Sequence, residues 1–241
     1  MADAAFANPR LAAVYDEFDG DRGDLDAYAA IAQELGASRV LDIGCGTGTL
    51  AVLLAAQGLE VIGVDPADAS LDVARMKPGA DLVRWVHGDA TALPALDADL
   101  ATMTGNVAQA IVDPKDWRET LRGIHDALRP GGHLAFETRD PACRGWEEWT
   151  RAETHRIADV AGVGRVESWV ELTDVSLPLV RFTGTYVFHR DGAVLTSDST
   201  LRFRERHEVE ADLAAAGFDL HDLREAPDRP GRELVFIARR P

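Results

Sequence analysis

Three glycines at alternate positions, Gly44, Gly46 and Gly48, are the residues of this chain best suited to hold a ligand. They follow a mostly apolar run, residues 40–43, and precede a second apolar run typical of a helix. Because glycine has no Cβ, the backbone there can take positive φ angles and approach a bound molecule closely. Free N–H groups at the start of the helix point into the same space. The spacing therefore predicts a ligand-binding turn between a strand and a helix.

Asp42, two residues before the first glycine, decides which ligand the turn suits. The dinucleotide fingerprint G-x-G-x-x-G/A requires Gly or Ala where this chain has Thr49. A carboxylate at the end of the strand would repel a pyrophosphate but attract an ammonium group. The pattern D-x-G-x-G-x-G therefore favours an amino-acid group joined to a nucleoside over a dinucleotide.

The same residues resemble the first motif of the class I S-adenosylmethionine-dependent methyltransferases. The resemblance covers roughly residues 10–140. It implies that S-adenosylmethionine is the cofactor and S-adenosylhomocysteine the product. It also implies that the residues of the turn contact this cofactor, with Cys45 as a small residue that fits: Asp42, Gly44, Cys45, Gly46 and Gly48.

Two acidic residues downstream end short apolar runs. Asp65 follows residues 59–64, where an acid is placed to accept hydrogen bonds from both ribose hydroxyls. Asp89 follows a later run; in the family the matching Asp holds the adenine amino group, and its neighbour's N–H meets the ring. The resemblance thus predicts cofactor contacts by Asp65 with Pro66 and by Asp89 with Ala90. The alternative is that both acids are helix N-caps.

Residues 100–107 predict a fourth strand that breaks into a Gly-Asn turn. In the family, this turn lies beside the methyl group and its acceptor. Thr104, Gly105 and Asn106 are therefore predicted to contact the cofactor. An ordinary turn-forming role is the alternative for Asn106.

Arg139 and Tyr15 are predicted to position the substrate. Arg139 follows the predicted fifth strand and is similar to an arginine of glycine N-methyltransferases that receives the substrate carboxylate, which a planar guanidinium suits. An ion pair with Glu137 or Asp140 would explain this arginine without a substrate. Tyr15 resembles the tyrosine that many small-molecule methyltransferases carry on an N-terminal helical lid, near the methionine end of the cofactor. Its alternative is a place in the core, as for Tyr28.

Strands alternate with helices along the chain, which predicts an α/β fold with a parallel sheet covered on both faces. The resemblance implies a Rossmann-like, doubly wound, seven-stranded, mostly parallel sheet whose last strand, residues 234–238, is antiparallel. Ligands bind such sheets at the carboxyl ends of the strands, where the three acids fall. We expect an N-terminal helical lid over residues 1–36 and a methyltransferase domain over residues 37–241.

Residues 163–204 have a different pattern and predict a small antiparallel insertion. Three consecutive strands are expected, and Asp191-Gly192 is a strong hairpin turn between the last two. The insertion would cover the site or form the interface of a homodimer. The alternative is a purely structural extension of the sheet.

The formal charge of −16, from 41 acidic and 25 basic residues, argues against a nucleic-acid partner. It indicates a solvated acidic surface or, alternatively, a preference for cationic substrates. No apolar run approaches the ~18 residues that cross a membrane, and the first eight residues lack the pattern of a secretory signal. Two cysteines, Cys45 and Cys143, form neither a disulfide framework nor a zinc site. We therefore expect a cytoplasmic protein without a metal.

Together, these residues predict a methyltransferase that acts at N or O of a small molecule. The sulfonium already makes the methyl group electrophilic, so the protein must align the acceptor and exclude water. Within this class, a protein or RNA acceptor stays open, and the acidic charge opposes RNA most. Two alternatives outside the class also stay open. One is a binding module that keeps the cofactor turn but has no activity, and the other is a nucleotide-dependent oxidoreductase, which Asp42 and Thr49 oppose.

Overall fold

The computed structural model describes residues 2–20 and 22–241. Its main element is a seven-stranded sheet in the order β10-β11-β5-β4-β1-β2-β3. In chain order, the strands are β1 (Arg39–Ile43), β2 (Glu60–Asp65), β3 (Val83–His87), β4 (Ala98–Met103), β5 (Leu128–Arg139), β10 (Asp219–Glu225) and β11 (Glu233–Arg239).

The direction of the strands confirms the predicted doubly wound sheet. β1 pairs in parallel with both β2 and β4, and β4 pairs in parallel with β5. The last strand, β11, runs antiparallel to β5 and to β10. The carboxyl ends of β1, β2, β4 and β5 therefore meet at one edge of the sheet, where residues distant in the sequence come together.

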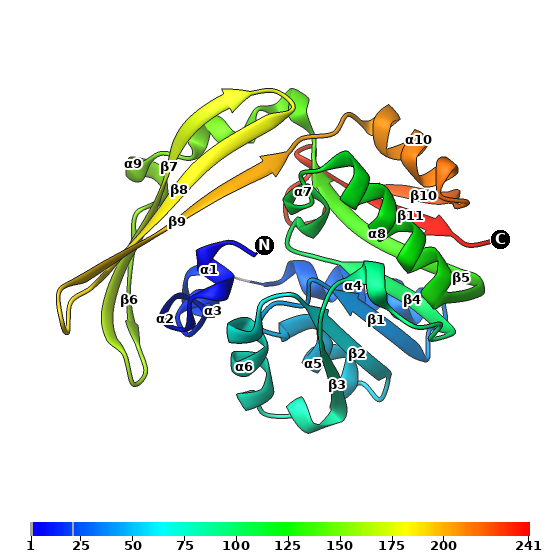
Figure 1. The fold of residues 1–241 in the computed structure, drawn as a ribbon, viewed down its shortest axis with the longest axis horizontal. Helices are drawn as coiled ribbons and strands as arrows, with labels where there is room; N and C mark the ends of the chain where they lie inside the picture. The colour runs from blue at the N-terminus through cyan, green and yellow to red at the C-terminus, as the bar shows by residue number, and fades with distance from the viewer. Residues whose placement is uncertain (1, 21) are drawn as a thin grey trace.

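Helices cover both faces of this sheet (Figure 1). On one face, α4 (Asp24–Glu34) and α5 (Thr49–Ala56) pack against apolar residues such as Val40. On the other, α8 (Pro114–Ala127) and α10 (Arg206–Ala215) pack against residues such as Leu41. Neighbouring residues of β1 thus serve opposite faces, as side chains of a strand alternate. The other helices between the strands are α6 (Asp68–Met76), η1 (Ala80–Leu82), η2 (Ala90–Ala92) and α7 (Val107–Ala110).

A second sheet is antiparallel, as the sequence predicted, with strand order β6-β7-β8-β9. Its strands are β6 (Arg156–Val160), β7 (Gly164–Ser176), β8 (Leu179–Phe188) and β9 (Ala193–Arg202), and η3 (Pro141–Cys143), η4 (Gly145–Glu148) and α9 (Arg151–Thr154) lead into it. The sheet begins earlier than expected, because β6 is a mostly exposed edge strand without a clear apolar pattern. We call this sheet the cap; the homodimer through it stays a prediction.

Three short helices, α1 (Ala4–Ala7), α2 (Pro9–Ala12) and α3 (Tyr15–Phe18), lie between the cap and the main sheet (Figure 1). Leu11 and Val14 pack against apolar residues of the cap. Asp16 of α3 contacts the part of the chain that carries the main sheet. Its carboxylate lies 2.7 Å from Lys77 Nζ and accepts a hydrogen bond of 2.5 Å from Thr47. The short helices thus contact both parts, whereas α4 packs into the core of the main sheet. The division into a lid and a domain stays a prediction.

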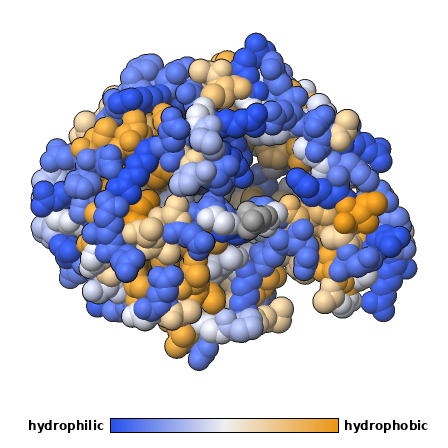
Figure 2. All heavy atoms as spheres, turned by 180° about the vertical axis from the view of Figure 1, so that it is seen from behind, coloured by the Kyte–Doolittle hydropathy of each residue, from blue (hydrophilic) through white to orange (hydrophobic). Residues whose placement is uncertain are grey.

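Hydrophilic side chains cover most of the face that Figure 2 shows, which agrees with the charge of −16. None of the helices formed by residues 2–20 and 22–241 has the length and apolar character needed to cross a membrane. The same residues contain no group of three or more His, Cys, Asp or Glu side chains that could hold a metal ion.

Arg204 connects the cap to α7 and gives a first testable prediction. Its buried guanidinium donates hydrogen bonds of 2.8 and 2.7 Å to the carbonyl oxygens of Ala108 and Ile111, and it lies 4.5 Å from the centre of the Trp117 ring. We expect Arg204→Ala to lower the free energy of unfolding by about 2 kcal/mol, because it leaves two buried carbonyl groups without donors. Urea denaturation measures this change.

The matched control is Arg118→Ala, which removes an exposed arginine of α8. Its effect on the free energy of unfolding should stay within about 0.5 kcal/mol. Equal urea midpoints for the two variants would show that the contacts of Arg204 contribute nothing to stability.

Candidate cofactor and acceptor site

The glycine turn joins β1 to α5 and has the backbone that the sequence predicted. Gly44, Gly46 and Gly48 have φ angles of +66°, +52° and +79°, a region that other residues rarely adopt. The N–H of Gly44 donates to the carbonyl oxygen of Val64, at 2.8 Å, which fixes the turn to the end of β2. A Cβ on Gly44 would lie 2.5 Å from a methyl carbon of Val107. The turn therefore has no room for a side chain at this glycine.

Asp65 connects the end of β2 to the turn. Its carboxylate accepts hydrogen bonds of 2.8 Å from Gly46 N–H and 2.7 Å from Ala67 N–H. Burial raises the pKa of this carboxyl, while the two backbone donors oppose the rise. Asp65 thus lies beside the glycines, where the expected contact with ribose would be made. That contact stays a prediction.

Asp42 is buried at the end of β1, and Cys45 is half-buried within the turn. Asp42 is 1% exposed and accepts a hydrogen bond of 2.8 Å from Thr102 Oγ1. Burial, with a smaller contribution from the Asp65 charge, raises the pKa of Asp42 to about 7. Burial also raises the pKa of the Cys45 thiol, so the thiol stays protonated at neutral pH. This agrees with the interpretation of Cys45 as a small residue that fits the turn.

Asp89 lies farther along the edge of the sheet, beyond β3. It is exposed and caps η2: its carboxylate accepts hydrogen bonds of 2.8 Å from Thr91 N–H and 2.5 Å from Thr91 Oγ1. The N-cap that the sequence left open as an alternative is therefore present. Ala90 is buried, and the carbonyl oxygen of Pro66 lies 3.0 Å from His87 Nε2. Contacts of Asp89, Ala90 and Pro66 with adenosine stay predictions.

A cavity of about 370 Å³ opens where β4 and β5 end. We call it the acceptor cavity. It brings together four of the predicted residues, which come from three separate parts of the chain: Tyr15, Gly105, Asn106 and Arg139. Thr104, which precedes them in the β4–α7 turn, is half-buried. A Cβ built on Gly105 would meet nothing within 4 Å, so this side of the turn faces open space.

Arg139 lines the cavity and also forms an ion pair. Its partner is Glu233 of β11, with 3.3 Å between Nε and Oε1, rather than Glu137 or Asp140. The guanidinium also donates to Gln109 Oε1 at 3.3 Å and lies 5.6 Å from the Trp149 ring centre. Burial lowers the pKa of Arg139, although Glu233 opposes this change. The sequence missed the partner because β5 and β11 become neighbours only in the folded sheet.

Tyr15 reaches the cavity from α3. Its hydroxyl donates a hydrogen bond of 3.3 Å to Asp19, and its ring lies 5.2 Å from that of Phe6. Burial, together with the Asp19 charge, raises the pKa of Tyr15, so the hydroxyl stays protonated. The tyrosine is therefore a hydrogen-bond donor or a wall of the cavity rather than a base.

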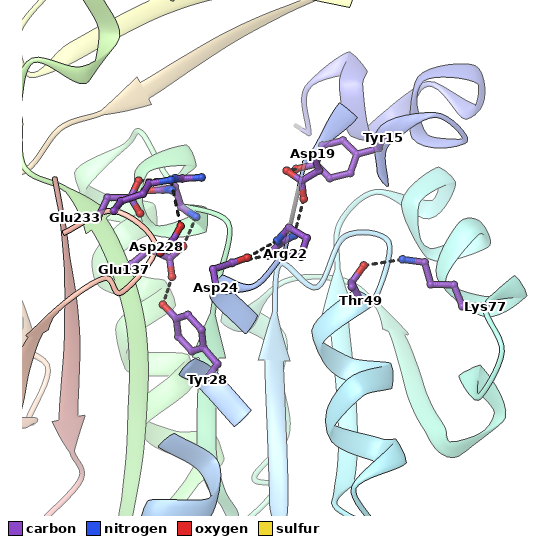
Figure 3. Close-up of polar contacts among 12 residues, drawn as sticks. Tyr15, Asp19, Arg22, Asp24, Tyr28, Thr49, Lys77, Glu137, Asp228 and Glu233 are labelled. Atoms are coloured by element: carbon purple, nitrogen blue, oxygen red, sulfur yellow. Dashed lines mark hydrogen bonds and ion pairs between the residues drawn. The ribbon is translucent and has the colours of Figure 1, made fainter. Parts of the chain in front are cut away.

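Most residues of the cavity were not predicted as site residues, among them Arg22, Tyr28 and Glu137. Arg22 forms ion pairs with Asp19 at 2.6 Å and Asp24 at 2.9 Å (Figure 3). Tyr28, expected in the core, is buried there, but its hydroxyl donates a hydrogen bond to Glu137 of β5. An acid at the end of an apolar strand was the signal available for Glu137. No local pattern distinguishes Arg22 from other basic residues.

This arrangement fits an adenosine joined to an amino acid. The turn leaves no room for a side chain at Gly44, and Asp65 places a carboxylate next to it. The Arg22 guanidinium lines the adjoining cavity, where it is paired with Asp19 and Asp24. Backbone groups, a carboxylate and a guanidinium thus lie in one continuous region of the sheet edge.

Comparison with known proteins identifies the family. A model of the methyltransferase domain matches residues 40–132. The cypemycin N-terminal methyltransferase of a Streptomyces species is 35% identical over 226 residues, which cover 90% of this chain and 89% of that protein. A ubiquinone biosynthesis O-methyltransferase of Ruegeria pomeroyi is 35% identical over 120 residues, and the match covers only 44% of its length.

Solved structures agree in fold. The CcbJ methyltransferase of Streptomyces caelestis has a TM-score of 0.78 at 23% identity and covers 99% of both chains. The sugar N-methyltransferase KedS8 of a Streptoalloteichus species has a TM-score of 0.74 at 19% identity, with 94% of this chain and 90% of that chain covered. The chain belongs to the class I S-adenosylmethionine-dependent methyltransferases. The predicted family, fold and cofactor are therefore confirmed.

Proposed function

We propose that the protein transfers the methyl group of S-adenosylmethionine to a nitrogen or oxygen atom of a small molecule bound in the acceptor cavity. The observation that carries the proposal is the convergence of Tyr15, Asn106 and Arg139 on one cavity beside the β4–α7 turn. The volume of about 370 Å³ lies in the range of roughly 300–1,000 Å³ that small-molecule sites occupy.

The residues of the chain have separate tasks in this reaction. The glycine turn and Asp65 hold the adenosine part, with Asp89 and Ala90 at the adenine, and Asp42 and Arg22 contact the amino-acid group. Bound S-adenosylmethionine supplies an electrophilic methyl group on a positively charged sulfur. The protein contributes alignment and the exclusion of water. Helices α1–α3, which Asp16 connects to the end of α6 and to the glycine turn, cover the site and exclude water.

The related proteins support a small acceptor. KedS8 is described as a sugar N-methyltransferase, and CalS10 of Micromonospora echinaspora as an amino pentose methyltransferase. The Ruegeria relative is described as an O-methyltransferase, so both acceptor atoms occur among similar proteins. The charge of −16 further opposes a nucleic-acid acceptor.

Calorimetric titration with S-adenosylhomocysteine, followed by the same titration with NAD, tests the binding of the cofactor. We expect micromolar binding of S-adenosylhomocysteine and no measurable binding of NAD, because Asp42 and Thr49 do not suit a pyrophosphate. Methyl transfer to amines and phenols is then assayed. Failure of S-adenosylhomocysteine to bind would refute the proposal, and so would a preference for NAD.

A further inference from the structure

Glu137 is a buried carboxyl group at the wall of the acceptor cavity, with 6% of its surface exposed. Its Oε1 accepts a hydrogen bond of 2.6 Å from the N–H of Asn106. Its other oxygen accepts one from the hydroxyl of Tyr28, which points to it from α4 (Figure 3). Both donors are neutral. Among the described residues, no nitrogen of Arg, Lys or His lies within ion-pair distance of Glu137.

The arginines of the cavity are already engaged with other acids. Arg22 pairs with Asp19 and Asp24, Arg139 with Glu233, Arg224 with Glu34 and Asp222, and Arg229 with Glu233 and Asp228. Glu137 is thus a buried acid of the cavity without a positive partner. A buried carboxylate in that position is costly unless a cation joins it. Burial accordingly raises the pKa of Glu137 to about 7.

Asn106 provides a second incomplete group at the same place. Its side chain lines the cavity and is 5% exposed, and its Oδ1 has no hydrogen-bond partner among the described residues. Because the backbone of Asn106 is bonded to Glu137, the two acceptors are held together. Buried acceptors of this kind almost always have a donor in a complete structure. A ligand with at least two N–H groups and a positive charge would supply the positive partner that Glu137 lacks and the hydrogen-bond donor that Asn106 Oδ1 lacks.

We propose that the methyl acceptor is an amine, whose ammonium group binds between Glu137 and Asn106 and gives one proton to Glu137. The inference rests on the proposed function and specifies its substrate class. The N–H of the ammonium group donates to the carboxylate and to Asn106 Oδ1. The same acid that attracts the cation then receives its proton.

The surroundings of Glu137 favour this role. The titratable and charged groups that face it are Tyr28 and Asp24 from α4, Glu233 from β11, Arg139 from β5 and Asp42 from β1. The acids dominate, so they attract a cation and raise the proton affinity of Glu137. Burial lowers the pKa of the entering ammonium group at the same time and opposes the surrounding acids, which raise it. The two proton affinities approach each other, which is the condition for proton transfer.

The ammonium group loses one proton to the Glu137 carboxylate, which becomes a carboxylic acid, and the nitrogen gains a free lone pair. This lone pair forms the new N–C bond to the methyl carbon while the C–S bond breaks and its electron pair stays on sulfur. The products are a methylated ammonium and neutral S-adenosylhomocysteine. Tyr28 keeps its proton throughout and orients Glu137.

Sinefungin tests the proposal, because it is an analogue of S-adenosylhomocysteine in which a carbon bearing an ammonium group replaces the sulfur. Calorimetry measures its affinity relative to that of S-adenosylhomocysteine between pH 6 and pH 8. We expect sinefungin to bind about tenfold more tightly at pH 8, as one charge-assisted hydrogen bond would produce. The ratio should fall toward one at pH 6, where Glu137 is protonated. Asp42 acts equally on the amino-acid group that both ligands carry, and the Glu137→Gln variant separates its effect on the additional ammonium group of sinefungin from that of Glu137.

Glu137→Gln should remove the pH dependence of this ratio and most of the preference for sinefungin. The matched control, Glu119→Gln, changes a partly exposed glutamate of α8 that pairs with Lys115, and it should retain both. A ratio that does not change with pH in the parent protein would overturn the inference, even if Glu137→Gln failed to fold. Failure of S-adenosylhomocysteine to bind would instead refute the proposed function, so the two failures are distinguishable.

Discussion

Replacing Asp65 with alanine is expected to lower the affinity for S-adenosylhomocysteine about 100-fold. A carboxylate that accepts hydrogen bonds from two ribose hydroxyls contributes roughly 3 kcal/mol, and each 1.4 kcal/mol is a factor of ten. The side chain also holds the N–H groups of Gly46 and Ala67, at 2.8 and 2.7 Å, so its loss loosens the turn as well. Isothermal titration calorimetry measures the affinity directly.

Asp65→Asn is the matched variant. It keeps one side-chain oxygen for the N–H of Gly46 or Ala67 but loses the charge and one acceptor. We expect an affinity between those of the parent and Asp65→Ala, roughly tenfold below the parent. If Asp65→Ala binds S-adenosylhomocysteine as tightly as the parent, the predicted role of this carboxylate in holding the ribose is wrong.

Replacing Gly48 with alanine is expected to destabilise the protein by about 3 kcal/mol. Its φ of +79° costs any other residue about 1–2 kcal/mol, and the new methyl group would also overlap the Trp85 ring and approach Ala74 Cβ to 2.9 Å. In a domain of this size, each kilocalorie lowers the melting temperature by about 2–4 °C. Differential scanning calorimetry without ligand should therefore show a decrease of about 6–12 °C.

The variant Gly58→Ala separates the cost of backbone strain from the cost of overlap with Trp85. Gly58 has a φ of +90°, but a Cβ at this position would meet nothing within 4 Å. The variant therefore carries the backbone strain without the overlap, and we expect a loss of about 1–2 kcal/mol. If Gly48→Ala melts at the same temperature as Gly58→Ala, contact with Trp85 does not require a glycine in the turn.

Local patterns were sufficient for the parts of the fold that depend on neighbouring residues. Short apolar runs between helical segments predicted the central strands. The three glycines predicted a turn with positive φ angles. Edge elements were harder to predict: β6 has little apolar surface, so the cap begins before the expected boundary. An exposed edge strand needs only one partner strand and leaves a weak pattern in the sequence.

The residues of the candidate site could also be predicted only in part from the sequence. Tyr15, Asn106 and Arg139 could be selected from motifs, and the structure brings them to one cavity. The pairs that define the chemistry of this cavity could not be selected. Glu137 meets Tyr28 of α4, and Arg139 meets Glu233 of β11, across strands and helices far apart in the chain.

The sequence by itself determined the family, the alternation of strands and helices up to β5, and the strand–turn–helix that suits S-adenosylmethionine. These properties depend on periodicity and on glycine conformation, which act within a few residues. Only the tertiary structure decided which charges are paired and which buried acid lacks a partner. The free energy of a buried charge depends on every group that packs around it, and those groups become neighbours only when the sheet has formed.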